Sequence, residues 1–150
     1  MNAMKSRLSI AALAVVALVV AGSLRAADKE KAELKCPVSG KTASADHKVA
    51  FNGGDVEFCC PNCPAAFKKN EKKFAGKANL QLVQSGQLKQ VKCPLTGRAM
   101  AADKIVEIAG AEISVCCANC LGKVKKLETD DEKITLLLSD TSKGFEAVKK

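Results

Sequence analysis

The sequence predicts an α+β fold made of two small, similar units, each built from a cysteine-containing turn, a β-hairpin and a short helix. An internal repeat is the first observation behind this prediction. Residues 35–71 align without a gap with residues 92–128, at an offset of 57, and 15 of the 37 positions are identical. All eight cysteines fall at matching positions of the two copies. In each copy, two short strand-like runs flank a glycine, and the residues after the last cysteine have the spacing of a helix. We therefore expect each copy to form one small module of two strands and a helix.

Each copy begins with the same tight turn. It reads Cys-Pro-x-Ser/Thr-Gly and contains Cys36 in the first copy and Cys93 in the second. Proline fixes one backbone dihedral angle, and glycine supplies the positive φ angle that lets backbone amides face a thiolate. We call these turns, residues 36–41 and 93–98, the first and second knuckle.

A hairpin and a helix follow each knuckle. Asn52-Gly53-Gly54 is a strong hairpin signal, and Ala109-Gly110 holds the same place in the second copy. The predicted strands cover residues 47–51, 55–59, 105–108 and 112–116. The predicted helices cover residues 63–74 and 120–127.

The segments outside the repeat are less regular. Alternating leucines predict that residues 79–84 and 87–92 form a hairpin around Ser85-Gly86 that joins the two units. Residues 133–138 are expected to form the matching strand of the second copy. Residues 141–150 are expected to form either a short amphipathic helix or a frayed tail.

The N-terminus has the pattern of a secretory signal peptide. Lys5 and Arg7 precede an apolar run at residues 8–21, and small residues follow. The run is short for a bilayer span, which disfavours the alternative of an uncleaved anchor. The predicted organisation is a signal peptide (1–26), a flexible lead-in (27–34), two cysteine-rich repeats (35–84 and 85–140) and a tail (141–150). We therefore expect an exported protein, periplasmic or secreted, without stable membrane association after signal cleavage.

The net charge of +8 does not indicate nucleic-acid binding. Signal cleavage would remove Lys5, Arg7 and Arg25 and lower the charge to +5. The remaining excess is spread over lysine-rich segments typical of solvated helix faces. The chain has no tryptophan or tyrosine, and single-strand binders stack bases on such aromatic side chains.

The chemistry of the two units depends on their thiols. Modules this small bury a thin core and need a metal ion, disulfides or a partner to stay folded. A knuckle cysteine, a hairpin, and cysteines at a strand end and a helix start form the arrangement of a treble-clef metal site. The helix N-terminus favours thiolates, which Zn(II) and Cu(I) accept readily as ligands.

We therefore predict one zinc or copper(I) ion per repeat, held by cysteines of the knuckle and of the Cys-Cys-x-x-Cys motif. The candidate ligands are Cys36, Cys59, Cys60, Cys63, Cys93, Cys116, Cys117 and Cys120. Spacing does not decide whether adjacent cysteines both reach the metal. Three thiolates suit Cu(I), whereas four suit Zn(II) in a closed structural site. The metal can be a structural staple or cargo, and cargo would imply a metal transporter or chaperone as partner.

The pattern Cys36-x22-Cys59-x3-Cys63 resembles the YHS/TRASH-type metal-binding domains, with Phe58 before the cysteine pair and Phe67 on the following helix. Cys93, Cys116 and Cys120 repeat the spacing. The resemblance covers about residues 35–74 and 92–128 and implies heavy-metal sensing, transport or trafficking, especially of copper. It also implies that the three spaced cysteines of each copy are the ligands. The chain departs from the family in having Cys60 and Cys117 and in lacking the Tyr-His-Ser triplet.

Two other uses of the cysteines remain open. An even number of cysteines in a small exported chain is typical of a disulfide framework, although adjacent cysteines are unusual in one. The two Cys-x-x-Cys motifs at predicted helix starts also fit a thiol–disulfide redox protein, but no βαβ pattern surrounds them.

Other residue types give weaker signals. His47 has no counterpart in the second copy, where Lys104 stands, so it is not a shared ligand. A single methionine in the mature chain, Met100, does not make a copper-binding cluster. No phosphate loop and no paired-carboxylate motif is present, so we do not expect an enzyme.

Overall fold

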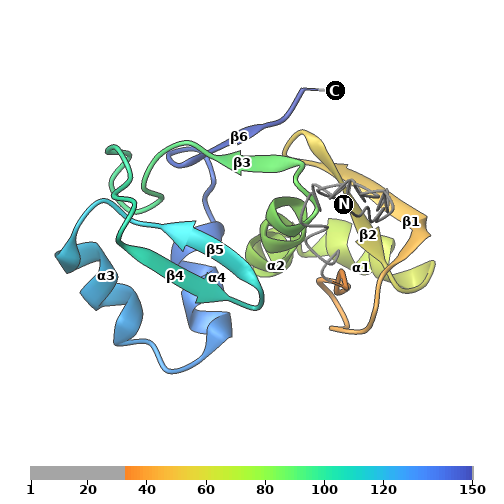
Figure 1. The fold of residues 1–150 in the computed structure, drawn as a ribbon. Helices are drawn as coiled ribbons and strands as arrows, with labels where there is room; N and C mark the ends of the chain where they lie inside the picture. The colour runs from red at the N-terminus through yellow and green to blue at the C-terminus, as the bar shows by residue number, and fades with distance from the viewer. Residues whose placement is uncertain (1–32, 150) are drawn as a thin grey trace, which may run out of the picture.

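The computed structural model of the chain describes residues 33–149. Two hairpin-and-helix units lie on either side of a long helix, and a two-stranded ribbon runs beside it (Figure 1). The expected signal peptide at residues 1–26 lies outside the described residues, as does most of the lead-in at 27–34. Within the described range, no helix is long and apolar enough to cross a membrane.

The first unit contains strands β1 (Ser44–Phe51) and β2 (Gly54–Phe58), which pair antiparallel, and helix α1 (Asn62–Lys69). Asn52 and Gly53 adopt positive φ angles of 47° and 80° in the connecting turn. Asparagine and glycine tolerate this conformation best, which is why the dipeptide makes a tight hairpin. The predicted hairpin is confirmed.

The second unit repeats this arrangement. Strands β4 (Ile105–Ile108) and β5 (Ala111–Ser114) pair antiparallel, and helix α3 (Ala118–Lys125) follows. Ala109 and Gly110 have φ angles of 47° and 81°, so the turn has the geometry of the first despite its alanine.

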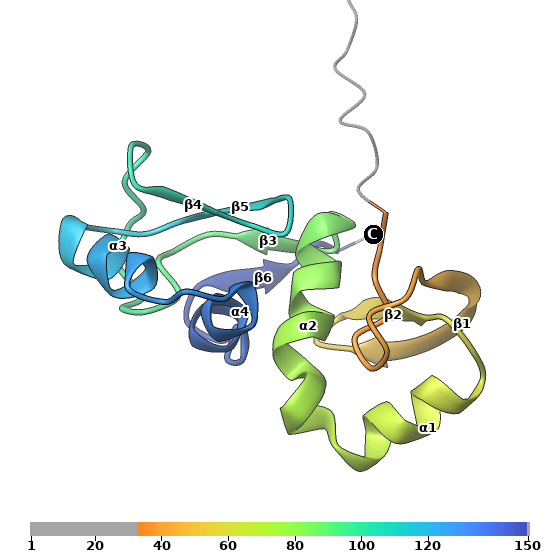
Figure 2. The ribbon, with the colours of Figure 1, turned by 90° about the horizontal axis from the view of Figure 1, so that it is seen from below.

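Each unit continues into a second helix and a short strand. These are α2 (Glu71–Gln84) with β3 (Leu88–Gln90), and α4 (Asp130–Leu138) with β6 (Phe145–Ala147). Helices α2 and α4 lie side by side between the units (Figure 2). Lys77 Nζ of α2 lies 3.0 Å from an Asp131 carboxylate oxygen of α4. Strands β3 and β6 pair antiparallel, with Lys89 opposite Glu146.

The described residues form two hydrophobic clusters, one per unit. The first is built from β2, α1 and α2, and its largest fully buried side chains are Phe58, Phe67 and Leu82. The second is built from the β4–β5 hairpin, α3 and α4, and it includes Ile108, Ile113, Leu137 and Leu138. Leu80 of α2 belongs to this second cluster, so α2 contributes to both cores.

The α+β class is confirmed, but the predicted hairpin joining the units is wrong. Residues 79–84 are the last part of α2, and β3 pairs with β6. The alternation of Leu80 and Leu82 was misleading because the intervening Asn79 and Gln81 are also buried. Their amides hydrogen-bond to backbone groups far away in the sequence, so this face of the helix is wider than its apolar residues indicate.

Three further expectations are corrected. Residues 133–138 form part of α4, whose start is fixed by a reciprocal hydrogen-bonded cap between Thr129 and Glu132. The tail contains strand β6 where a short helix or a frayed end was expected, because residues 145–147 pair with β3. The single helix expected over residues 63–74 is interrupted at Asn70, whose backbone leaves the helical region (φ −139°, ψ 47°).

Candidate metal centres

Each knuckle is a closed backbone turn that presents its cysteine to the hairpin. In the first, Cys36 N–H donates to the Lys41 carbonyl at 2.7 Å and Gly40 N–H donates to the Cys36 carbonyl at 2.8 Å. The second knuckle has both equivalent bonds, each at 2.8 Å. Gly40 has a φ angle of 73° and Gly97 one of 70°, so glycine is required for this turn.

The structure brings three cysteines of each repeat together. The thiol groups of Cys36, Cys59 and Cys63 all lie within 4.8 Å of one another, and the same holds for Cys93, Cys116 and Cys120. We call these groups the first and second triad. In each triad the knuckle supplies one thiol, the end of the hairpin the second and the start of the following helix the third.

The spacing of the sulfur atoms fits a bound metal ion. Cys59 Sγ and Cys63 Sγ are 3.7 Å apart, and so are Cys116 Sγ and Cys120 Sγ. An ion with metal–sulfur bonds of about 2.3 Å holds two thiolates about 3.8 Å apart in a tetrahedron. The hairpin and helix-start thiols of each triad are therefore spaced as ligands of one metal ion, and the knuckle thiol lies within 4.8 Å of both.

Both triads lie at the edge of a hydrophobic core. Cys36 and Cys63 belong to the first cluster, beside Phe58 and Phe67, and are 1% and 7% exposed. Cys93 and Cys120 have the same position in the second cluster. Cys59 and Cys116 are half-buried, so each site has a dry inner side and a side that faces water.

A hydroxyl group accompanies each triad. Ser39 Oγ lies 3.1 Å from Cys59 Sγ, and Thr96 Oγ1 lies 3.2 Å from Cys116 Sγ. Burial by itself would raise the pKa of the Cys36 thiol. Hydrogen bonds from the Ser39 hydroxyl and from backbone N–H groups, including that of Cys59, outweigh it and lower the pKa to about 7. Cys93 has a pKa of about 7 because burial is outweighed by hydrogen bonds from Thr96 and the backbone.

The helix-start thiols are shifted in the opposite direction. Burial, followed by hydrogen bonds with Cys60 and Cys59, raises the pKa of Cys63 above its usual range. Burial and hydrogen bonds with Cys117 and Cys116 raise that of Cys120 to about 12. The raised pKa values of Cys63 and Cys120 disfavour a third thiolate in each triad without a cation, and a metal ion would supply the missing positive charge.

In each unit one glutamine ties the residue before the knuckle to the hairpin. Gln81 of α2 donates to the carbonyls of Lys35 and Glu57, each at 2.9 Å, and accepts from Glu57 N–H at 2.6 Å. In the second unit, Gln90 of β3 donates to the carbonyls of Lys92 and Ser114 at 3.1 and 2.6 Å and accepts from Ser114 N–H at 2.8 Å.

The two glutamines act on equivalent backbone groups from different elements. Lys92 and Ser114 are the repeat counterparts of Lys35 and Glu57, whereas position 81 corresponds to Leu138 and position 90 to Glu33. Sequence reasoning missed both residues because the repeat alignment does not pair them. The shared hydrogen-bonding pattern holds the start of the knuckle at a fixed distance from the hairpin in both sites.

The other predicted residues lie at or outside the triads. Cys60 and Cys117 are next to the triads but not members of them, and both are half-buried. His47 lies in β1, outside both triads, and Met100 is 39% exposed. All eight cysteines are within the described residues, and in the structure all are free thiols.

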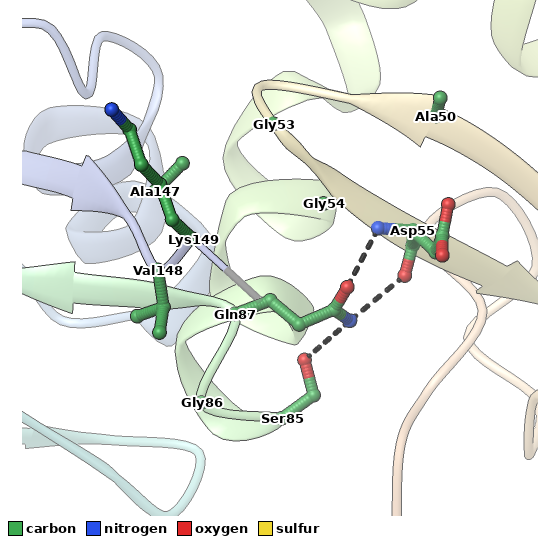
Figure 3. A pocket seen from close by; sticks show the side chains of 10 residues that line it. All are labelled: Ala50, Gly53, Gly54, Asp55, Ser85, Gly86, Gln87, Ala147, Val148 and Lys149. Carbon is green, nitrogen blue, oxygen red and sulfur yellow. Dashed lines mark hydrogen bonds between the residues drawn. The ribbon is translucent and has the colours of Figure 1, made fainter.

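A cavity of about 530 Å³ lies away from the thiols, between the β1–β2 turn, the turn after α2 and the end of β6 (Figure 3). In the wall of this cavity, the Gln87 side-chain amide accepts a hydrogen bond from Asp55 N–H at 2.7 Å and donates to the Asp55 carbonyl at 3.0 Å and to Ser85 Oγ at 2.9 Å. The polar atoms of the Gln87 side chain are therefore bonded within the protein, and the triads remain the candidate functional sites.

Comparison of the chain with protein-family models, curated proteins and solved structures finds no match.

Proposed function

We propose that this protein is an exported metal-binding protein that holds one soft metal ion, zinc or copper(I), in each triad and serves in metal trafficking or sequestration. Three thiolates per site form the ligand set, and its softness favours these two metals over harder cations. A metal transporter or chaperone is the partner class that such a role requires.

The single observation that carries this proposal is the duplication of the triad geometry. The two sets of thiols lie in segments that share 15 of 37 aligned positions, about 41% identity, and packing alone would not keep a common sulfur spacing in segments that have diverged this far. The hairpin-to-helix sulfur distance is nevertheless 3.7 Å in both copies. A shared ligand explains why this spacing is retained.

Further support comes from the sequence. The cysteine pattern resembles YHS/TRASH-type domains, which are associated with heavy metals, and the N-terminal segment has the pattern of a signal peptide. Among the described residues, neither triad includes a histidine or carboxylate that would act as a general base. We therefore propose a binding role without catalysis.

Native mass spectrometry of protein purified without reducing agent tests the proposal, followed by thiol counting after denaturation. We expect two metal ions per chain and eight free thiols, and the added mass identifies the metal. Cell fractionation of a tagged full-length chain tests export separately.

A metal-free chain whose mass is lower by two protons per bridge, with no free thiols, would contradict metal binding. The disulfide framework would then account for the cysteines. Bridges limited to Cys60–Cys63 and Cys117–Cys120 would instead indicate a redox protein, because Cys60 Sγ and Cys63 Sγ are already 3.3 Å apart.

A further inference from the structure

Each repeat has a fourth cysteine that directly follows the hairpin cysteine and is not a member of the triad. In the first repeat, Cys60 Sγ lies 3.3 Å from Cys63 Sγ. Cys117 is the repeat equivalent of Cys60 and directly precedes helix α3, which contains Cys120. The fourth thiol of the first repeat therefore contacts the helix-start cysteine from outside the compact group that includes the knuckle cysteine.

The fourth thiol of each repeat is more exposed than the knuckle and helix-start thiols. Cys36 and Cys93 are 1% and 0% exposed, and Cys63 and Cys120 are 7% and 5% exposed. Cys60 and Cys117 are half-buried, and the two residues after each of them, at 61–62 and 118–119, are exposed. The fourth thiol therefore lies, like the half-buried hairpin cysteine, on the water-facing side of the site, where a metal ion that leaves the buried thiols can reach it.

We propose that Cys60 and Cys117 are exchange thiols, which take the metal from the buried knuckle cysteine and present it to an incoming thiol ligand. This inference rests on the proposed function and specifies how cargo metal is transferred. The metal–sulfur bond to Cys60 forms as the bond to Cys36 breaks. Cys60 gives up its proton to water, the released Cys36 thiolate takes up one proton, and the metal keeps its oxidation state. Cys117 and Cys93 play the same parts in the second repeat.

A resident fourth ligand is the competing role for these cysteines, and it predicts effects of opposite sign. Removing a resident ligand weakens binding and speeds release of the metal. Removing an exchange thiol leaves the three-thiolate site intact and slows release, because the metal loses its intermediate outside the triad.

The test uses the full mature chain loaded with two equivalents of Zn(II) under anaerobic conditions. Release is followed by stopped flow after mixing with excess chromogenic chelator, and equilibrium affinity is measured by competition with the same chelator. The variants are Cys60→Ala, Cys117→Ala and their combination. Cys60→Ser and Cys117→Ser serve as second variants that preserve polarity at the helix start, and Cys36→Ala is the control for loss of a triad ligand.

We expect each single alanine variant to slow one of two release phases on the order of tenfold, equal to about 1.4 kcal/mol of activation free energy, and the double variant to slow both. Equilibrium affinity should stay within about threefold of wild type. Unchanged or faster release by the alanine and serine variants would overturn the exchange role while leaving metal binding intact. Failure of the wild-type chain to bind zinc at equilibrium would overturn zinc as the cargo and, with it, the exchange of zinc. Loading the chain with Cu(I) in the same way then shows whether copper is bound in its place.

Discussion

Lys89 and Glu146 lie opposite one another in the β3–β6 ribbon and are separated by 57 residues, the offset of the sequence repeat. Antiparallel pairing of two equivalent residues places a local two-fold axis between them. Leu80 and Leu137 are also repeat equivalents, and both belong to the second hydrophobic cluster where α2 packs near α4. The duplicated halves therefore associate as the two subunits of a symmetric dimer would, within one chain.

The α2–α4 contact gives a first prediction. A Cβ atom at Gly76 would lie 2.9 Å from Ile134 Cγ2 and 3.3 Å from the Ile134 carbonyl oxygen, so Gly76→Ala must push the helices apart. We expect the free energy of unfolding in urea to fall by about 1–3 kcal/mol. Gly122→Ala in α3 is the matched control, since nothing lies within 4 Å of its added Cβ. Helix propensity should make that variant more stable by up to about 1 kcal/mol. Equal effects of the two substitutions would contradict close packing at Gly76.

The hydrogen bonds of Gln81 and Gln90 give a second prediction, in which each substitution affects only one of the two metal sites. Gln81→Leu removes three hydrogen bonds to the first knuckle and hairpin, and Gln90→Leu removes three from the second. We expect each to lower metal affinity about tenfold at its own site only, the lower end of the effect seen for groups that orient ligands. Competition titration with a chelator measures both sites.

Gln84→Leu is the control for this experiment. Gln84 donates to the Ala109 carbonyl at 2.7 Å and forms no hydrogen bond with either knuckle. Its substitution should leave both affinities unchanged. If Gln81→Leu lowers the metal affinity of both sites equally, the substitution acts through a general loss of stability, and Gln81 does not position the first site.

The hydroxyl beside each triad gives a third prediction. Burial raises the pKa of the Cys36 thiol, and the Ser39 hydroxyl is the largest opposing influence, so the net pKa is about 7. Ser39→Ala removes a donor that stabilises the thiolate, and we expect the Cys36 pKa to rise while that of Cys93 stays near 7. Metal-free Ser39→Ala protein should therefore need a higher pH to ionise Cys36. Carbon-13 NMR of labelled cysteine follows each thiol during a pH titration.

Thr96→Ala should reverse the pattern, because Thr96 has the equivalent role beside Cys93. Thr96→Ser keeps the hydroxyl and should preserve the Cys93 pKa. A Cys36 pKa that does not move in Ser39→Ala would mean that backbone N–H groups alone stabilise the thiolate.

Metal removal gives a fourth prediction. The triads require the knuckle, hairpin and helix in their folded positions, so a metal that binds only the folded chain stabilises it. At a free metal concentration of about 1,000 times the dissociation constant, each site should add about 4.1 kcal/mol to the free energy of unfolding. Thermal melts with and without metal measure this effect. The double variant Cys36→Ser, Cys93→Ser lacks one triad thiolate per site and should show a much smaller metal-dependent shift, and a shift as large as that of the wild type would show that the triads are not the binding sites.

Local sequence signals predicted much of each unit. The hairpin turns follow from Asn52-Gly53 and Ala109-Gly110, and the knuckles from proline and glycine at fixed offsets. The start of α4 also has a local signal that sequence reasoning missed. Thr129 followed three residues later by Glu132 is the pattern of a capping box, and the structure forms both of its hydrogen bonds.

The sequence by itself determined the duplication, the two hairpins and the knuckles, because these depend on residue identity and short-range backbone geometry. The tertiary structure decided that Asn79 and Gln81 are buried in a helix, because their partners at Leu138, Lys35 and Glu57 are far away along the chain. It also decided that residues 145–147 form a strand, since three residues form one only when β3 lies beside them. The division of four cysteines into three clustered thiols and one outer thiol was likewise decided by the fold, because spacing alone does not orient adjacent side chains.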